Sequence, residues 1–179
     1  MGIKKVQRRE WRNNMFIEKN NVIRKNLFKQ IDSLTNEQFN EKPDEESWSP
    51  KEIIDHLVKM EKTIIKGIKK ELENPTSPKV KKKPIKLSTL RIVKVKAPTY
   101  TEPSSEYSRT EEMKAQLHQV RMELLSLYKS SNPSILEGKS LKHPIFGQVP
   151  LIQWFEFTGL HEKRHAKQLE KTINKIRSH

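Results

Sequence analysis

Cysteine is absent from this sequence of 179 residues. Its absence excludes disulfide bonds, zinc ribbons, iron–sulfur clusters and a cysteine nucleophile. A bound metal ion would therefore need histidine, aspartate, glutamate or water as ligands, and thiol chemistry would need a thiol from outside the chain. Glycine is also scarce, with 5 residues and no glycine-rich run, which argues against a P-loop or Rossmann nucleotide site.

Long hydrophobic runs are missing as well. No apolar stretch approaches the roughly 18 residues that a transmembrane helix needs, so we expect no membrane association. The N-terminal residues lack the apolar core of a signal peptide, and we expect a cytoplasmic protein. Hydrophobic residues make up only 33% of the chain, but they recur in periodic clusters, which indicates a folded protein. The length suits a single domain, residues 1–179.

Basic residues are in excess, and the formal net charge is +14. About half of this excess lies between Asn74 and Pro103, where seven lysines and one arginine accompany one glutamate and five prolines. Because prolines interrupt regular structure, this segment is expected to be a basic connecting insertion rather than a recognition helix, and we expect no nucleic-acid partner. Within it, residues 85–87 and 91–95 contain β-branched side chains and are expected to form short extended pieces.

Apolar residues at helical spacing predict four long helices, and no segment shows a convincing strand pattern. Two of the helix starts carry the S-x-x-E pattern of a capping box, Ser49 to Glu52 and Ser108 to Glu111. Residues 35–47 are expected to be a polar connection. Together these features predict an all-α fold, a four-helix bundle. The expected helices are residues 10–31, 50–74, 108–131 and 150–177.

Three histidines lie on apolar faces that such a bundle would bury. His161 and His165 are four residues apart and therefore lie one turn apart on the same face of the last helix. His56 lies on the apolar stripe of the second helix. A buried histidine needs a partner to offset its lost hydration, and three imidazoles can bind one divalent ion. The alternative is that each is an ordinary core histidine with its own hydrogen bonds.

The last two of these histidines also complete the H-E-x-x-H pattern of zinc peptidases. A metzincin would have its third histidine at position 171, where this chain has Lys171. Other enzymes of this class take the third ligand from a later helix, for which few residues remain after His165. The pattern also normally follows a sheet, which is not expected here. We therefore expect no peptidase activity.

Two sequence blocks resemble the DinB/YfiT-like superfamily of small metal-binding four-helix proteins. The first block is similar to that family's W-S-x-x-E-x-x-x-H-L segment and runs from Trp48 to Leu57. The second is similar to the family's sequence of H-P-x-F-G, a tryptophan and H-x-x-R-H-x-x-Q, and corresponds here to residues 143–147, Trp154 and residues 161–168. The order of the blocks and the overall length also match, and the basic insertion at 74–103 is the departure from the pattern.

The resemblance implies a metal site and a topology. It implies one divalent metal ion, zinc or nickel, bound by His56, His161 and His165. It also implies an up-down-down-up order of helices with a long connection between the second and third, and frequent homodimers. Characterised relatives include S-transferases that use bacillithiol or mycothiol and a thiol-dependent maleylpyruvate isomerase.

Three neutral imidazoles leave the charge of a divalent ion uncompensated, which favours an anionic further ligand. We therefore expect a metal-dependent S-transferase that activates a low-molecular-weight thiol, such as bacillithiol, against an electrophilic small molecule. Glu162, Trp154 and Gln168 lie beside the histidine stripe and are expected to orient ligands or line the pocket. Equally, Trp154 could be a core residue and Glu162 could pair with a nearby basic residue. Arg164 is expected to point outward or form an ion pair, and His143 to cap its loop or line the mouth of the site. Alternatives are a metal-dependent hydrolase of a small substrate and a non-catalytic, metal-stabilised stress-response protein.

Overall fold

The computed structural model describes residues 2–89 and 101–178, with side chains from residue 15 onward. The predicted four-helix bundle is confirmed, and its long helices surround one hydrophobic core. No described helix is long and apolar enough to cross a bilayer. The elements are α1 (Gly2–Ile31), α2 (Asn36–Asn40), α3 (Pro50–Glu73), the 3-10 helix η1 (Ile85–Thr89), α4 (Thr110–Ser130), α5 (Pro133–Gly138), β1 (Ser140–His143), β2 (Gly147–Pro150) and α6 (Leu151–Arg177).

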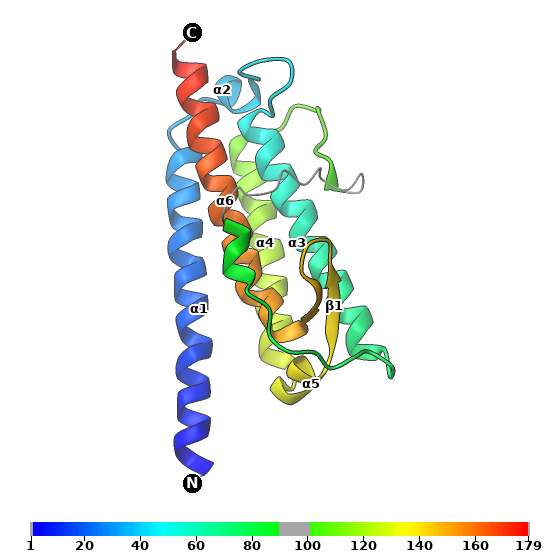
Figure 1. The fold of residues 1–179 in the computed structure, drawn as a ribbon. Coiled ribbons are helices and arrows are strands. Elements are labelled where there is room, and N and C mark those ends of the chain that lie inside the picture. Colours follow the sequence, from blue (N-terminus) through cyan, green and yellow to red (C-terminus); the bar gives the residue numbers. More distant parts are fainter. Residues whose placement is uncertain (1, 90–100, 179) are drawn as a thin grey trace.

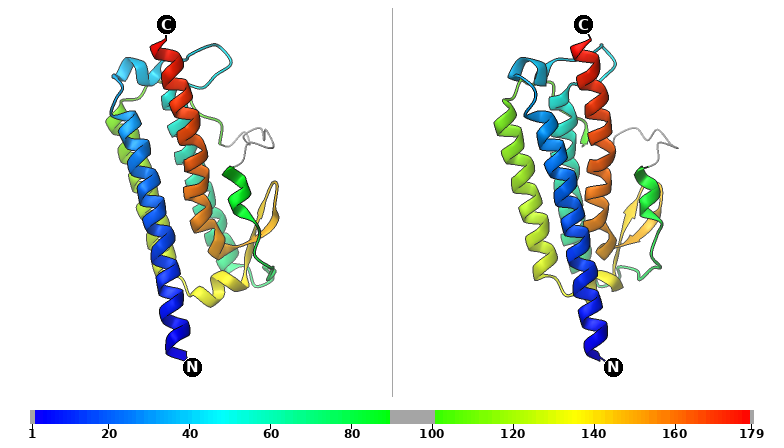
Figure 2. Two further views of the ribbon diagram at one scale, coloured as in Figure 1. Left: turned by 60° about the vertical axis from the view of Figure 1, so that its left-hand side comes forward. Right: turned by 90° about the vertical axis from the view of Figure 1, so that its left-hand side faces the viewer.

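The helices follow the up-down-down-up order that the family resemblance implies (Figure 1). Helix α1 packs mainly against α6, and α3 packs mainly against α4. Because α3 and α4 run in the same direction, the chain must return along the length of the bundle between them. The basic insertion lies within this return, and η1 packs on α6 beside the β1–β2 hairpin (Figure 2).

The start of α3 confirms its predicted capping box. The backbone N–H of Glu52 donates to Oγ of Ser49 at 3.1 Å, and the backbone N–H of Ser49 donates to Oε2 of Glu52 at 2.9 Å. These two bonds satisfy N–H groups that the first helical turn leaves free. They therefore fix the start of α3, the helix that carries His56 in its second turn.

The start of α4 differs from its prediction. The expected box from Ser108 to Glu111 is wrong, because the helix begins at Thr110 and the backbone N–H of Arg109 donates to Glu112 instead. Ser108 stays outside the helix because its backbone N–H and carbonyl both bond the side chain of Asn40, at 3.1 and 2.9 Å.

Several short elements were not predicted. A β-hairpin joins β1 to β2 in antiparallel register, with His143 opposite Gly147. Helix α2 lies within the expected polar connection, and α5 follows α4 directly. Residues 85–89 form η1 rather than an extended piece, and the extended piece expected at 91–95 lies outside the described residues.

Candidate metal centre

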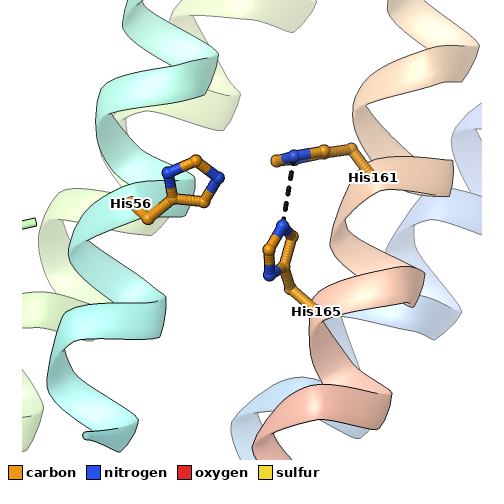
Figure 3. Close-up of side chains that lie close together, drawn as sticks. All are labelled: His56, His161 and His165. Carbon is orange, nitrogen blue, oxygen red and sulfur yellow. Dashed lines mark hydrogen bonds between the residues drawn. The ribbon is translucent and has the colours of Figure 1, made fainter. Parts of the chain in front are cut away.

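Helices α3 and α6 bring three histidines to one point in the bundle (Figure 3). One ligand nitrogen from each of His56, His161 and His165 lies within 4.8 Å of the other two. Nε2 of His161 and Nε2 of His165 are 3.2 Å apart, as expected for rings one turn apart on a helix. The structure thus brings together the three histidines singled out in the sequence.

Hydrogen bonds fix the tautomers of two of these rings. Nδ1 of His56 lies 2.9 Å from the carbonyl oxygen of Thr101, and Nδ1 of His165 lies 2.9 Å from Oε1 of Gln168. Since these oxygens accept hydrogen bonds, each Nδ1 carries the proton and each Nε2 keeps its lone pair. Gln168 therefore lies where the sequence suggested, as the partner of a candidate ligand, whereas Thr101 was not anticipated.

The surroundings of His56 and His161 favour the neutral form of these two rings. Burial lowers the pKa of His56, and this effect outweighs the hydrogen bond to Thr101 that raises it. The pKa of His161 is held well below its usual range by loss of hydration and then by His165 and His56. Neutral imidazoles are the form that binds metal ions.

The donor set fits a divalent ion such as zinc. Two nitrogens bound tetrahedrally at roughly 2.0–2.1 Å from zinc lie about 3.3 Å apart, close to the 3.2 Å between His161 and His165. His56 completes a set of three neutral ligands, which in zinc enzymes leaves a position for water or substrate. The geometry thus suits a catalytic type of site.

The end of the basic insertion is fastened to α3 around His56. Lys51 and Lys59 donate to the backbone carbonyls of Ser104 and Glu102, at 2.8 and 2.9 Å. Oδ2 of Asp55 accepts from the backbone N–H of Ser104 at 2.7 Å. These contacts hold Thr101, which is fully buried, against the histidine ring.

Aromatic rings flank the histidines. The ring centroid of Trp48 lies 5.1 Å from that of His56, and the ring of Phe157 stacks on His161 at 5.9 Å. Trp154, expected beside the metal, contacts Phe157 at 5.2 Å, and its indole N–H donates to the carbonyl of Val149 at 3.3 Å. The structure therefore places Trp154 in the aromatic layer next to the histidines.

His143 belongs to this aromatic layer and is not one of the clustered ligands. Its Nδ1 accepts the backbone N–H groups of Ile145 and Phe146, at 3.0 and 3.3 Å, so it caps its own loop, one of the two roles expected for it. Its ring packs against Trp154 and Phe157 with centroids 5.5 and 4.9 Å apart. Burial lowers its pKa from 6.5 to about 4, so it is neutral at physiological pH.

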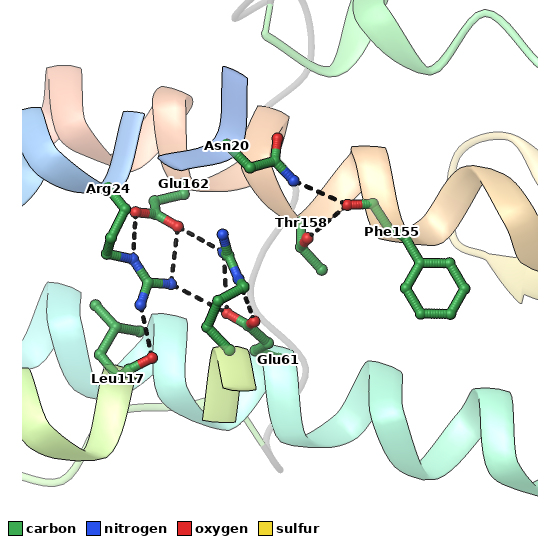
Figure 4. Close-up of polar contacts among 8 residues, drawn as sticks. Asn20, Arg24, Glu61, Leu117, Phe155, Thr158 and Glu162 are labelled. Carbon is green, nitrogen blue, oxygen red and sulfur yellow. Dashed lines mark hydrogen bonds and ion pairs between the residues drawn. The ribbon is translucent and has the colours of Figure 1, made fainter. Parts of the chain in front are cut away.

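Glu162 faces the bundle core, where it joins a buried ion-pair network of four residues (Figure 4). Its carboxylate accepts from Arg24 at 2.6 and 2.9 Å and from Arg121 at 2.7 Å. Glu61 accepts from the same two arginines, at 3.3 Å from Arg24 and 2.5 Å from Arg121. The carboxylate of Glu162 is thus engaged by both arginines. One residue comes from each long helix, α1, α3, α4 and α6, and none is more than 7% exposed.

The sequence indicated only that Glu162 could pair with a nearby base; this four-residue network, which we call the Arg–Glu network, was not predicted. A signal was present, because Arg24 and Arg121 each adjoin apolar residues of a predicted buried stripe. The two arginines and two glutamates together carry no net charge. The network therefore ties all four helices together immediately beside His161 without adding charge to the histidine cluster.

Comparisons with known proteins identify a family model and a relative that match this chain. Residues 21–169 match the DinB superfamily. The chain is 33% identical over 156 residues to the uncharacterized protein YuaE of Bacillus subtilis (strain 168), covering 87% of this chain and 96% of that protein.

Two solved structures share the fold. YfiT from Bacillus subtilis, described as a probable metal-dependent hydrolase with an unusual four-helix bundle topology, superposes with a TM-score of 0.64 at 12% identity, over 90% of this chain and 85% of that one. The four-helix bundle protein TT2238 superposes with a TM-score of 0.59 at 17% identity, over 88% of this chain and 98% of that one.

Proposed function

The chain belongs to the DinB superfamily, and from that premise we propose that it is a metal-dependent enzyme that activates a small nucleophile at His56, His161 and His165. The observation that supports this most directly is the convergence of the three imidazoles, with lone pairs directed by the hydrogen bonds of Thr101 and Gln168. A divalent ion held there, zinc or nickel, would supply Lewis-acid activation of water or a thiol.

The residues of the chain have distinct parts in this proposal. The three imidazoles bind without contributing charge, so the site favours an anionic nucleophile. Thr101 and Gln168 hold the Nδ1 protons and so keep each ring in its binding tautomer. Trp48 and Phe157 pack against the ligand rings and restrict their movement.

Two nucleophiles fit this site. Water would make the chain a hydrolase of a small substrate, and the description of YfiT as a probable metal-dependent hydrolase supports this candidate. A low-molecular-weight thiol such as bacillithiol would make it an S-transferase. Because the chain has no cysteine, the thiol of such a transferase would have to come from a diffusible cofactor.

Elemental analysis of untagged protein, purified without a nickel column, tests the site. We expect near-stoichiometric zinc or nickel in the natural chain, strong loss in His56→Ala, and no loss in the control His118→Ala, whose histidine is exposed. If neither the natural chain nor the control binds metal after zinc or nickel is added, the proposal is wrong.

Kinetics of the metal-loaded protein then separate the nucleophiles. A panel of activated esters and amides is assayed in water alone, and alkylating electrophiles are assayed with increasing thiol. Metal-dependent cleavage without thiol identifies a hydrolase, whereas a rate that saturates with thiol identifies a transferase. A metal that raises thermal stability without supporting either reaction would identify the non-catalytic, metal-stabilised protein.

A further inference from the structure

Arg164 lies on the side of the histidine stripe that faces away from the core. Successive residues of an α-helix are about 100° apart, so Glu162 is turned about 100° from His161 in one direction and Arg164 about 60° in the other. Glu162 joins the Arg–Glu network in the bundle core. Arg164 therefore lies on the opposite flank, and its side chain is half-buried.

The basic insertion docks on the same flank of α6. Helix geometry places Gln153 within about 20° of Arg164 when α6 is viewed along its axis. The side chain of Gln153 accepts a hydrogen bond from the backbone N–H of Lys83 at 2.8 Å and donates one to the carbonyl of Lys83 at 2.9 Å. Helix η1 follows and packs on α6. No aspartate or glutamate occurs in residues 75–101, so this segment brings no carboxylate to Arg164.

Arg164 was expected to form an ion pair or point outward, but within the described ranges it forms no hydrogen bond or ion pair and is half-buried. Its positive charge nevertheless acts on the histidines, since it lowers the pKa of both His56 and His161. Arg164 is also three residues from His161, a spacing that makes the two side chains neighbours on the surface of α6.

The acidic residues closest to the histidines are already paired. Asp55 accepts from Lys59 at 2.9 Å and from the backbone N–H of Ser104. Glu162 is bound by both arginines of the Arg–Glu network. Three neutral imidazoles, a divalent ion and Arg164 would therefore form a site with a large uncompensated positive charge, which an anionic ligand would relieve.

We propose that Arg164 binds an oxyanion of the substrate, a carboxylate or a tetrahedral oxyanion, while another atom of the same molecule occupies the metal centre. The inference rests on the proposed function and makes it more specific, because it assigns the substrate to the class of small anionic molecules. Arginine suits this role because its planar, permanently charged fork forms paired hydrogen bonds with oxyanions.

Cobalt-loaded protein provides a test that does not depend on activity. Thiolate binding to Co(II) produces a charge-transfer absorption band, so three thiols that differ only in their tails can be titrated. The probes are 2-mercaptoethanol with a neutral tail, 3-mercaptopropionate with a carboxylate and 2-mercaptoethanesulfonate with a tetrahedral oxyanion. Each variant is compared with the natural chain for the same thiol, so differences in thiol pKa cancel.

We expect Arg164→Gln to weaken binding of at least one anionic thiol about tenfold, with little change for 2-mercaptoethanol. Arg164→Lys should retain part of that preference. The control Lys167→Gln removes the same charge from an exposed position on α6 and should retain all of it. The anionic thiol with the larger loss shows which oxyanion geometry the site takes.

The possible failures are distinguishable. If Arg164→Gln changes the affinities of all three thiols equally, or of none, the inference about Arg164 is wrong while the metal site stands. If the natural chain takes up no cobalt and no other divalent metal, the proposed function itself is wrong, and the inference falls with it. Metal content measured on every variant separates these results.

Discussion

Nδ1 of His56 donates a hydrogen bond to the backbone carbonyl of Thr101, across 2.9 Å. The two residues belong to different parts of the chain, since His56 lies in α3 and Thr101 lies near the end of the basic insertion. The insertion therefore reaches a candidate metal ligand and sets its tautomer. Because outer partners of metal-bound histidines commonly tune affinity, the anchoring of this segment should be measurable as metal affinity.

Ser104→Pro should weaken metal binding by about 10- to 100-fold. The substitution removes the backbone N–H that Asp55 accepts at 2.7 Å, and with it a bond that holds the segment carrying Thr101. Competition with a chromophoric chelator measures the affinity, and circular dichroism confirms that the variant is folded. Ser105→Pro is the matched control, because its residue is exposed and adjacent. Equal loss in both variants, or none in Ser104→Pro, would contradict the prediction.

Glu162→Gln should lower the free energy of unfolding by about 3–5 kcal/mol. The change leaves Arg24 and Arg121 buried with only Glu61 as a counter-charge. Urea unfolding measures the loss. Glu123→Gln is the control, since the exposed pair of Glu123 and Lys69 at 2.7 Å should be worth less than about 1 kcal/mol. Similar small losses in the two variants would show that the Arg–Glu network contributes little.

The clustering of the three histidines could be predicted from sequence because its signal is local. His161 and His165 are related by helical spacing, and His56 lies on the apolar stripe of another predicted helix; the family resemblance implies the same three residues. The start of α3 was predicted for the same reason, since both halves of its capping box lie within Ser49–Glu52. The four long helices and their order were confirmed as well.

The features that were missed depend on distant partners. The start of α4 is displaced because Asn40 binds Ser108 across 68 positions of the chain. The two strands of the hairpin have four residues each, too few for a periodic pattern. Arg24 could be seen as a charge beside a buried stripe, but its pairing with Glu162 requires the packing of α1 on α6. Local periodicity holds no information about such pairings.

His143 should make the metal-free protein lose stability as the solution becomes acidic. Its pKa is about 4 when folded and 6.5 when its environment is unperturbed, so the unfolded chain takes up the proton first. The stabilising contribution is complete above pH 6.5, decreases as the pH falls toward 4, and totals at most about 3 kcal/mol, because solvent screens part of it.

The matched variant for that measurement is His143→Asn. Its side-chain oxygen replaces Nδ1 as acceptor for the N–H groups of Ile145 and Phe146, but it does not titrate. Urea unfolding of both proteins, with metal removed by chelation, should show the natural chain losing more stability than the variant between pH 7 and 4. Parallel curves would mean that His143 is hydrated when folded.

Gly159→Ala should destabilise the protein by about 1–3 kcal/mol, although alanine favours helices more than glycine does. A Cβ at this position would lie 1.8 Å from Oδ1 of Asn20, whose amide donates to the carbonyl of Phe155 at 2.9 Å (Figure 4). The substitution would therefore push α1 away from α6 or break that buried bond.

A double variant separates this close approach from helix propensity. Asn20→Ala removes the obstructing side chain, so Gly159→Ala should cost less in that background than in the natural chain. Gly138→Ala is the control, because nothing lies within 4 Å of its added Cβ. Thermal unfolding of the natural chain, the two single variants Asn20→Ala and Gly159→Ala, and the double variant gives the coupling between positions 20 and 159. Additive effects would show that α1 and α6 separate freely at this point. Helix α1 would then contribute less to positioning Arg24 than its contacts suggest.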